Sequence, residues 1–185
     1  MRLDRFDNRK FCRGRPHWIE ALWIVVSVLT VRSWLPGSRM RVSLLRLFGA
    51  KIGSGVVIKP SVMVKFPWNL EIGDYAWIGE RVWIDNLAEV RIGSHSCISQ
   101  GAYLCTGSHD WTRQSFDLVT RAINVEDQCW VGAMARLAPG SCMGQGAVLS
   151  LGSVGTGALD AWSIHRGNPA RKSSDRQQMG EPSIL

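Results

Sequence analysis

One histidine stands where the chain's regular pattern is interrupted. Up to residue 105 an aliphatic side chain recurs about every six residues, and then about fourteen residues following His109 do not fit that cycle before it resumes. Loops carried by a rigid scaffold commonly hold functional residues, and an imidazole can exchange a proton near neutral pH. We therefore expect chemistry at His109, with the rest of the chain forming a rigid prism that holds a cofactor beside it.

Two neighbours of His109 have alternative roles. Asp110 could orient the imidazole, as carboxylates commonly do, or it could simply open the loop, and we favour the loop. Cys105 could carry an acyl group as a nucleophile, but a wall position in the scaffold suits this small side chain better.

The metal-ligating residue types predict no metal site. Only His95 and His109 fall in the middle of the repeat region, and no third histidine is within reach by spacing. His17 and His165 have no partners in the sequence. The five cysteines are odd in number and follow no C-x-x-C spacing, which argues for a reducing compartment and against a disulfide framework or a zinc knuckle.

The scaffold that must position His109 is a short repeat. From Ile52 onward an aliphatic residue recurs every six positions, usually followed by Gly or another small or acidic residue, as in Ile72-Gly73 and Val131-Gly132. A fixed short period is the mark of a β-solenoid, in which six residues make one strand and one corner and three such faces close a triangular coil. Ile52, Ile72 and Ile92 are 20 residues apart and not 18, so two coils each carry a two-residue insertion at one corner.

The positive charge belongs to the N-terminus. Residues 1–51 carry eleven Lys and Arg against three acidic residues, a net charge of +8, whereas residues 52–185 carry eleven against twelve, a net of −1. A nucleic-acid-binding protein would need basic residues on its folded surface, so we expect no nucleic-acid partner.

The N-terminal residues predict helices that do not span a membrane. The uncharged run between Glu20 and Arg32 is eleven residues long, against the roughly twenty that a bilayer core requires, and no small-x-small cleavage site follows it. Residues 41–48 predict a second, amphipathic helix. Two roles stay open for the first helix: packing on the repeat domain or a neighbouring subunit, or lying on anionic lipid through residues 1–34, with tryptophans at the interface.

We thus expect four segments. Residues 1–17 form a basic, flexible segment, residues 18–51 a helical appendage, residues 52–170 the solenoid, and residues 171–185 a C-terminal tail.

Several motifs resemble one known family. The segment 67–79, the stretch 98–100, the stretch 103–110 and the passage from Gly152-Ser153-Val154 to Arg166-Gly167-Asn168-Pro169-Ala170 resemble the colanic acid biosynthesis acetyltransferase branch of the hexapeptide-repeat acyltransferases. The resemblance covers roughly residues 18–172. It implies a left-handed parallel β-helix, a homotrimer, and acetyl-CoA bound in clefts between adjacent prisms, with no metal needed for catalysis.

The resemblance also implies a reaction. A histidine at the position of His109 acts as the general base, removing the proton of a sugar hydroxyl as that hydroxyl attacks the thioester carbonyl. No covalent enzyme intermediate is needed, because both substrates are held together.

The resemblance also assigns cofactor contacts to individual residues of this sequence. The resemblance places Trp130 and Ala133 near the pantetheine arm, Leu151 and Thr156 further along the cofactor, and Arg171 with Lys172 near the adenosine phosphates, where cationic groups pair with phosphate oxygens. The closing coil departs from the family pattern at residues 157–161.

The acceptor side departs from the family pattern. Gly79 falls where galactoside-type relatives have an acceptor-binding asparagine, and Asp85 and Asn86 lie nearby as substitutes. Trp77 and Asp110 complete the expected acceptor residues. The tryptophans near this end either pack between subunits or stack on a sugar ring: Trp68, Trp77, Trp83 and Trp111.

The expected protein is a cytoplasmic O-acetyltransferase, peripheral on the inner face of the membrane if the N-terminus binds lipid. It would move acetyl from acetyl-CoA to a saccharide hydroxyl in exopolysaccharide or capsule biosynthesis. One alternative is acetylation of a small soluble acceptor such as a free sugar or an antibiotic. The other is a catalytically inactive β-helix adaptor.

Overall fold

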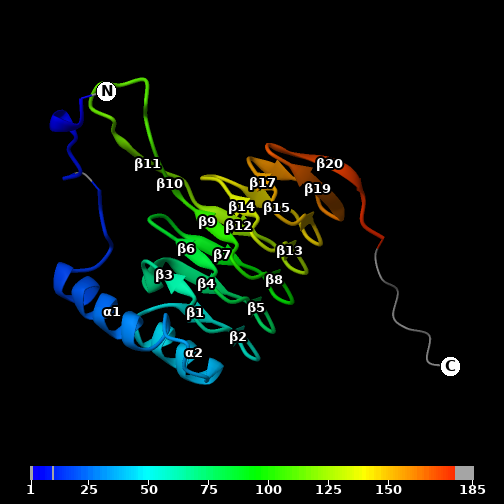
Figure 1. The fold of residues 1–185 in the computed structure, drawn as a ribbon, viewed down its shortest axis with the longest axis horizontal. Coiled ribbons are helices and arrows are strands. Elements are labelled where there is room, and N and C mark those ends of the chain that lie inside the picture. The colour runs from blue at the N-terminus through cyan, green and yellow to red at the C-terminus, as the bar shows by residue number, and fades with distance from the viewer. Residues whose placement is uncertain (1, 10, 178–185) are drawn as a thin grey trace.

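The chain forms two helices followed by a β-solenoid of about six turns. The structure is a computed structural model that describes residues 2–9 and 11–177. Figure 1 shows the helices against the first turns and the strands stacked in chain order along the prism. The predicted solenoid is confirmed.

Three sheets form the faces of the prism, and their strands are parallel except for the last strand of face B. Face A contains β1 (Lys51–Ile52), β4 (Leu70–Ile72), β7 (Val90–Ile92), β12 (Ile123–Val125), β15 (Cys142–Met143) and β18 (Ala158–Leu159). Face B contains β2 (Val57–Ile58), β5 (Trp77–Ile78), β8 (Cys97–Ile98), β13 (Trp130–Val131), β16 (Val148–Leu149), β19 (Ser163–Gly167) and β20 (Ala170–Asp175). Face C contains β3 (Met63–Val64), β6 (Trp83–Asp85), β9 (Tyr103–Cys105), β14 (Arg136–Leu137) and β17 (Val154–Gly155).

The core is a stack of inward aliphatic side chains, typically one from each short strand. On face A, Ile72 pairs in register with Ile92 and Ile92 with Val125, and all three are buried. Because each such side chain gains roughly 1.5–3 kcal/mol from burial, the repeated aliphatic position is what stabilises every coil. The pairing of Ile52 with Ile72 and of Ile72 with Ile92 confirms the twenty-residue coils.

All three irregular connections leave the solenoid at one corner, between faces C and A, which we call the C–A corner. The first contains the short helix η2 (Pro67–Asn69), and the second is formed by residues 86–89. The third contains the antiparallel strands β10 (Gly107–His109) and β11 (Leu118–Thr120). The expected loop after His109 is therefore the tip of a hairpin, and this hairpin projects from the prism in Figure 1.

The helical appendage is anchored by two buried side chains. α1 (His17–Leu29) inserts Trp23, whose indole N–H donates to the carbonyl of Val64 at 2.9 Å. From α2 (Ser38–Leu47), the buried Arg41 guanidinium donates to the carbonyls of Val31, Ser33 and Leu35, and its burial lowers the pKa of Arg41. Among the described residues, neither helix is long and apolar enough to cross a bilayer.

The described residues at both ends of the chain are held against the solenoid. The N-terminal arm, residues 2–9 and 11–16, contains the short helix η1 (Leu3–Arg5) and lies against the solenoid, where the ring of Phe11 stacks on Phe66 and the Trp68 indole donates to the carbonyl of Arg13. At the other end, residues 171–175 continue β20, which pairs antiparallel with β19. The expected tail therefore contributes a strand.

Candidate active site

The hairpin at the C–A corner presents His109 over the edge of the prism. Gly107, Ser108 and His109 of β10 pair with Thr120, Val119 and Leu118 of β11. A cavity of about 370 Å³ lies beside this hairpin. It is lined by Ser108, His109, Asp110, Trp111, Thr112, Val119, Arg121 and Pro139. Pro139 belongs to the corner of the next coil, so the cavity has the hairpin as one wall and the solenoid as another.

The imidazole of His109 is fixed on three sides. Its Nδ1 lies 2.8 Å from the carbonyl oxygen of Phe116, and because a carbonyl only accepts, Nδ1 carries the proton. The Phe116 ring stacks on the imidazole at 4.2 Å between centroids, and the Phe6 ring from the N-terminal arm meets it edge-on at 5.5 Å. In the neutral ring, Nε2 is left with its lone pair and can accept a proton from a bound hydroxyl.

Asp110 shapes the loop and does not contact the imidazole. Its carboxylate accepts hydrogen bonds from the Thr112 hydroxyl at 2.6 Å and the Thr112 backbone N–H at 3.0 Å, and it pairs with Arg113 at 3.3 Å. The Thr112 hydroxyl is the main reason that the pKa of Asp110 lies below its ordinary value. Of the two roles expected for Asp110, the contacts fit the opening of the loop.

The six expected cofactor residues fall on several parts of the prism. Thr156 follows β17 at the C–A corner, one coil beyond Pro139. Ala133 and Leu151 lie on adjacent coils at the corner between faces B and C, where the Gly152 N–H donates to the Ala133 carbonyl. Within one chain, face C therefore separates this pair from His109.

The other three expected cofactor residues belong to face B. Trp130 is half exposed there, and its indole donates to the Ser99 hydroxyl at 2.8 Å. Arg171 and Lys172 extend from β20 at the far end of the same face, where Lys172 pairs with Asp175 at 2.7 Å.

The expected acceptor residues do not form one group. Asn86 is buried, and its side-chain amide accepts from the backbone N–H of Phe66 at 3.0 Å and donates to the carbonyl of Phe66. Asn86 therefore joins two coils, and its buried side chain offers no exposed surface to an acceptor, unlike the role expected for it. Trp77 also lies away from His109, on face B.

Asp85, unlike Asn86 and Trp77, faces outward on face C next to the C–A corner. Its Oδ2 accepts from the Tyr103 hydroxyl at 3.1 Å, and the Lys65 ammonium lies 3.3 Å from Oδ1, close enough for an ion pair. Burial is the main reason that the pKa of Tyr103 is raised.

The four tryptophans expected near the acceptor are dispersed. Trp83 stacks on Tyr103 at 4.6 Å on face C, whereas Trp68 stacks on Phe66 at 5.0 Å beneath the N-terminal arm. Trp111 is exposed on the hairpin, and Trp77 is exposed on face B. The aromatic residues that do contact His109, Phe6 and Phe116, were not anticipated, because neither belongs to a motif.

Gly79, where the resemblance led us to expect an acceptor-binding asparagine in galactoside-type relatives, has a packing role. A Cβ added there would lie 2.5 Å from the backbone nitrogen of Gln100 on the next coil. The two coils approach so closely at this corner that a side chain at position 79 would force the backbone to shift, so packing in this chain requires the glycine.

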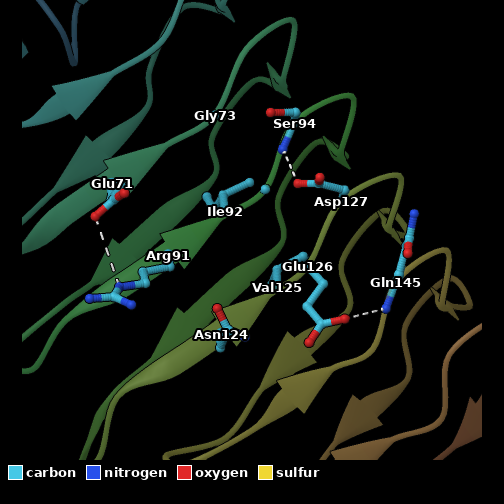
Figure 2. A pocket seen from close by; sticks show the side chains of 11 residues that line it. Glu71, Gly73, Arg91, Ile92, Ser94, Asn124, Val125, Glu126, Asp127 and Gln145 are labelled. Carbon is cyan, nitrogen blue, oxygen red and sulfur yellow. Dashed lines mark hydrogen bonds and ion pairs between the residues drawn. The ribbon is translucent and has the colours of Figure 1, made fainter.

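A second groove lies on face A and is lined by charged and polar residues. Figure 2 shows its charged residues, among which Glu71 and Arg91 pair at 3.9 Å. The Ser94 and Gln145 backbone N–H groups donate to the carboxylates of Asp127 and Glu126, at 2.7 and 2.8 Å. The groove, about 420 Å³ in volume, has no imidazole or thiol among its described lining residues. Its carboxylates hold the corners of adjacent coils together.

Among the described residues, neither the thiols nor the potential metal ligands form a second candidate active site. The five cysteines are unpaired, the Cys105 thiol donates to the Gly107 carbonyl at 3.2 Å, and burial raises the pKa of Cys129 to about 11. Within residues 2–9 and 11–177, no three His, Cys, Asp or Glu side chains come close enough together to hold a metal ion.

Comparison with known proteins places this geometry among acetyltransferases. The chain is 46% identical over 170 residues, 91% of its length and 93% of the relative's, to the Escherichia coli (strain K12) protein provisionally named colanic acid biosynthesis acetyltransferase WcaF. A hexapeptide-repeat acetyltransferase from Vibrio cholerae superposes with a TM-score of 0.80 at 22% identity, covering 88% of this chain and 93% of that one, and it has also been solved with acetyl-CoA at a TM-score of 0.79. A galactoside acetyltransferase in complex with coenzyme A superposes with a TM-score of 0.78 at 19% identity, covering 91% and 85%. No family model matches the chain.

Proposed function

Because this chain belongs to the hexapeptide-repeat acetyltransferases, we propose that it moves acetyl from acetyl-CoA to a saccharide hydroxyl, with His109 as the general base. The saccharide is a precursor of an exopolysaccharide or a capsule, the class to which the name of the Escherichia coli relative points. The observation that carries the proposal is the hydrogen bond from His109 Nδ1 to the Phe116 carbonyl, which leaves Nε2 free beside an open cavity.

The reaction needs one proton acceptor and one positioned pair of substrates. His109 Nε2 takes the proton of the acceptor hydroxyl as the hydroxyl oxygen attacks the thioester carbonyl carbon. The carbon–sulfur bond then breaks, and the imidazolium returns the proton to the departing sulfur. Both substrates are bound at once, so proximity supplies much of the rate and no acyl-enzyme is required.

The surface of the last coils fits an extended cofactor. A Cβ added at Gly152 or at Gly157 would meet no atom within 4 Å, so both corners are open to a narrow chain. Beyond them, Arg166 on β19 lies opposite Arg171 on β20, and Lys172 follows Arg171 in the chain. These three residues concentrate positive charge where the phosphates of coenzyme A would bind.

A homotrimer would complete this site. Ala133 and Leu151 lie at a different corner from His109, and a neighbouring copy can bring its own corner between faces B and C against the first copy's hairpin. Closed rotational symmetry then produces three equivalent clefts. The five free thiols favour a reducing compartment, consistent with a cytoplasmic reaction.

The test is a thiol-release assay of acetyl-CoA with a panel of saccharide acceptors, comparing wild type with His109→Ala. We expect acceptor-dependent release that falls by about 10²- to 10⁴-fold in the variant, the usual contribution of a general base. Acetyl-CoA should still raise the melting temperature of His109→Ala, which shows that binding is intact. Release that is unchanged in the variant would disprove the role of His109. Release only with free sugars or antibiotics would favour a soluble acceptor, and no release together with no acetyl-CoA binding would favour an inactive adaptor.

A further inference from the structure

The side of α1 that faces away from the solenoid is apolar except for the exposed His17 in its first turn. We call it the α1 outer face, and its side chains are 48% to 67% exposed: Trp18, Leu22, Ile24, Val25, Val28 and Leu29. The opposite side of the same helix is already packed, because Trp23 and Ser27 are buried against the solenoid. A continuous apolar patch of this kind on a folded protein usually marks a binding surface.

The flanks of the α1 outer face are aromatic and basic. Trp18 stands at one end, 67% exposed, and Trp34 lies just beyond the other end, 80% exposed. Arg15, Arg32 and Arg39 are exposed around the same helix and its connection to α2.

Negative charge is almost absent from this part of the chain. Between residues 8 and 70 the sequence has eleven Lys and Arg but one acidic residue, Glu20. The Glu20 carboxylate is already paired with Arg13 at 2.8 Å. Exposed Arg15, Arg32 and Arg39 therefore make the surface around α1 cationic, and a symmetric contact between two copies here would bring like charges together.

We propose that the α1 outer face binds the surface of an anionic lipid bilayer. The apolar side chains would enter the boundary between headgroups and acyl chains, Trp18 and Trp34 would lie at the interface, and the arginines would contact anionic headgroups. A helix of 13 residues is roughly 20 Å long and lies in the plane of the membrane without crossing it.

This surface is connected to the active site by the N-terminal arm. Figure 1 shows the arm leaving the start of α1 and running to the hairpin that carries His109. There Phe6 touches the imidazole, and the Arg2 backbone N–H donates to the Gln114 carbonyl. An acceptor sugar carried on a lipid would thus meet the enzyme at the membrane to which α1 is bound, a consequence that rests on the proposed function.

The experiment is co-sedimentation of the full chain with vesicles of phosphatidylcholine alone or mixed with phosphatidylglycerol. We expect binding to the anionic vesicles that weakens as salt is added, and little binding to phosphatidylcholine. The double variant Leu22→Glu and Val25→Glu places charge on the apolar face and should bind at least about tenfold more weakly. Its melting temperature and acetyl-CoA binding should stay unchanged, since both side chains are exposed. Tyr75→Glu, at an exposed solenoid corner, is the matched control and should bind vesicles like wild type.

Two results would overturn the proposal. One is equal vesicle binding by wild type and the double variant. The other is no vesicle binding by wild type together with a smaller oligomer in the double variant, which would assign the α1 outer face to a contact between copies. Neither result touches the proposed reaction, which is measured without vesicles, and His109→Ala should bind vesicles normally even though it lacks transfer.

Discussion

At the scale of single residues, the candidate base is oriented by the backbone and by two aromatic rings. The Phe116 carbonyl fixes the tautomer of His109, while Phe116 and Phe6 contact the imidazole from two sides. A carboxylate partner is therefore unnecessary, and Asp110 is used instead to hold the turn of the hairpin through Thr112 and Arg113.

This arrangement predicts a small effect of Asp110→Asn on catalysis. Removing a carboxylate that orients a catalytic histidine costs about 10⁴-fold in rate, whereas we expect less than about tenfold here. Since hydrogen bonding lowers the pKa of Asp110, its stabilisation of the loop is complete above the ordinary carboxyl pKa and is lost as pH falls through the lowered value. The contribution of Asp110 to the stability of the loop is therefore constant around neutral pH. Transfer rates near neutrality measure the effect, and a loss as large as that of His109→Ala would contradict the assignment.

At the scale of elements, the β19–β20 hairpin closes the solenoid and supplies the expected phosphate-binding residues. The backbone of His165 pairs with the preceding coil, where its carbonyl accepts from the Ser150 N–H at 2.9 Å, and its buried side chain lies 2.8 Å from the Ser163 hydroxyl of the same strand through Nε2. Burial is the main reason that the pKa of His165 is lowered from 6.5. A protonated imidazole is therefore disfavoured inside the hairpin.

The buried His165 predicts a loss of stability in acid. Between the ordinary pKa of 6.5 and its lower folded-state value, the unfolded chain binds a proton that the folded chain does not, so unfolding becomes easier as pH falls. Above the ordinary pKa, His165 is neutral in both the folded and the unfolded chain, so its titration does not change the free energy of unfolding. We expect the melting temperature to fall as pH decreases below the ordinary pKa of 6.5, and to fall less steeply in His165→Gln. Identical slopes in the two proteins would rule out His165 as the cause.

At the scale of the whole molecule, the prism distributes the expected site residues over two corners. The C–A corner has His109 and Thr156, and the corner between faces B and C has Ala133 and Leu151. The homotrimer that we propose would use these two corners, and the membrane that we propose as a partner would use the α1 outer face at the first coils.

The two-corner arrangement predicts that inactive variants rescue one another. His109→Ala removes the base at one corner, and Ala133→Trp blocks the other corner without touching the base. Each variant alone should be inactive, but random co-assembly would place two intact halves together in about a quarter of the clefts. We expect transfer activity to recover to about that fraction after the two chains are co-expressed. A site contained within one chain would show no recovery, and light scattering of each variant checks that the oligomer is unchanged.

The sequence by itself determined the solenoid, its twenty-residue coils and the interruption after His109. These features are local, because an aliphatic residue every six positions can be buried only by stacking identical coils, and an insertion can leave only at a corner. The apolar character of the N-terminal helix could also be predicted from the sequence, since composition alone determines it.

The tertiary structure decided which residues meet. It brought Phe6 against His109 across about a hundred positions, and it set Asn86 into the core, where its amide joins two coils. It also showed that Gly79 packs too closely against Gln100 to carry a side chain. A repeat specifies the position of each residue along its own coil. Contacts between coils, between the arm and the hairpin, and around α1 depend on packing at a distance, and no local pattern encodes them.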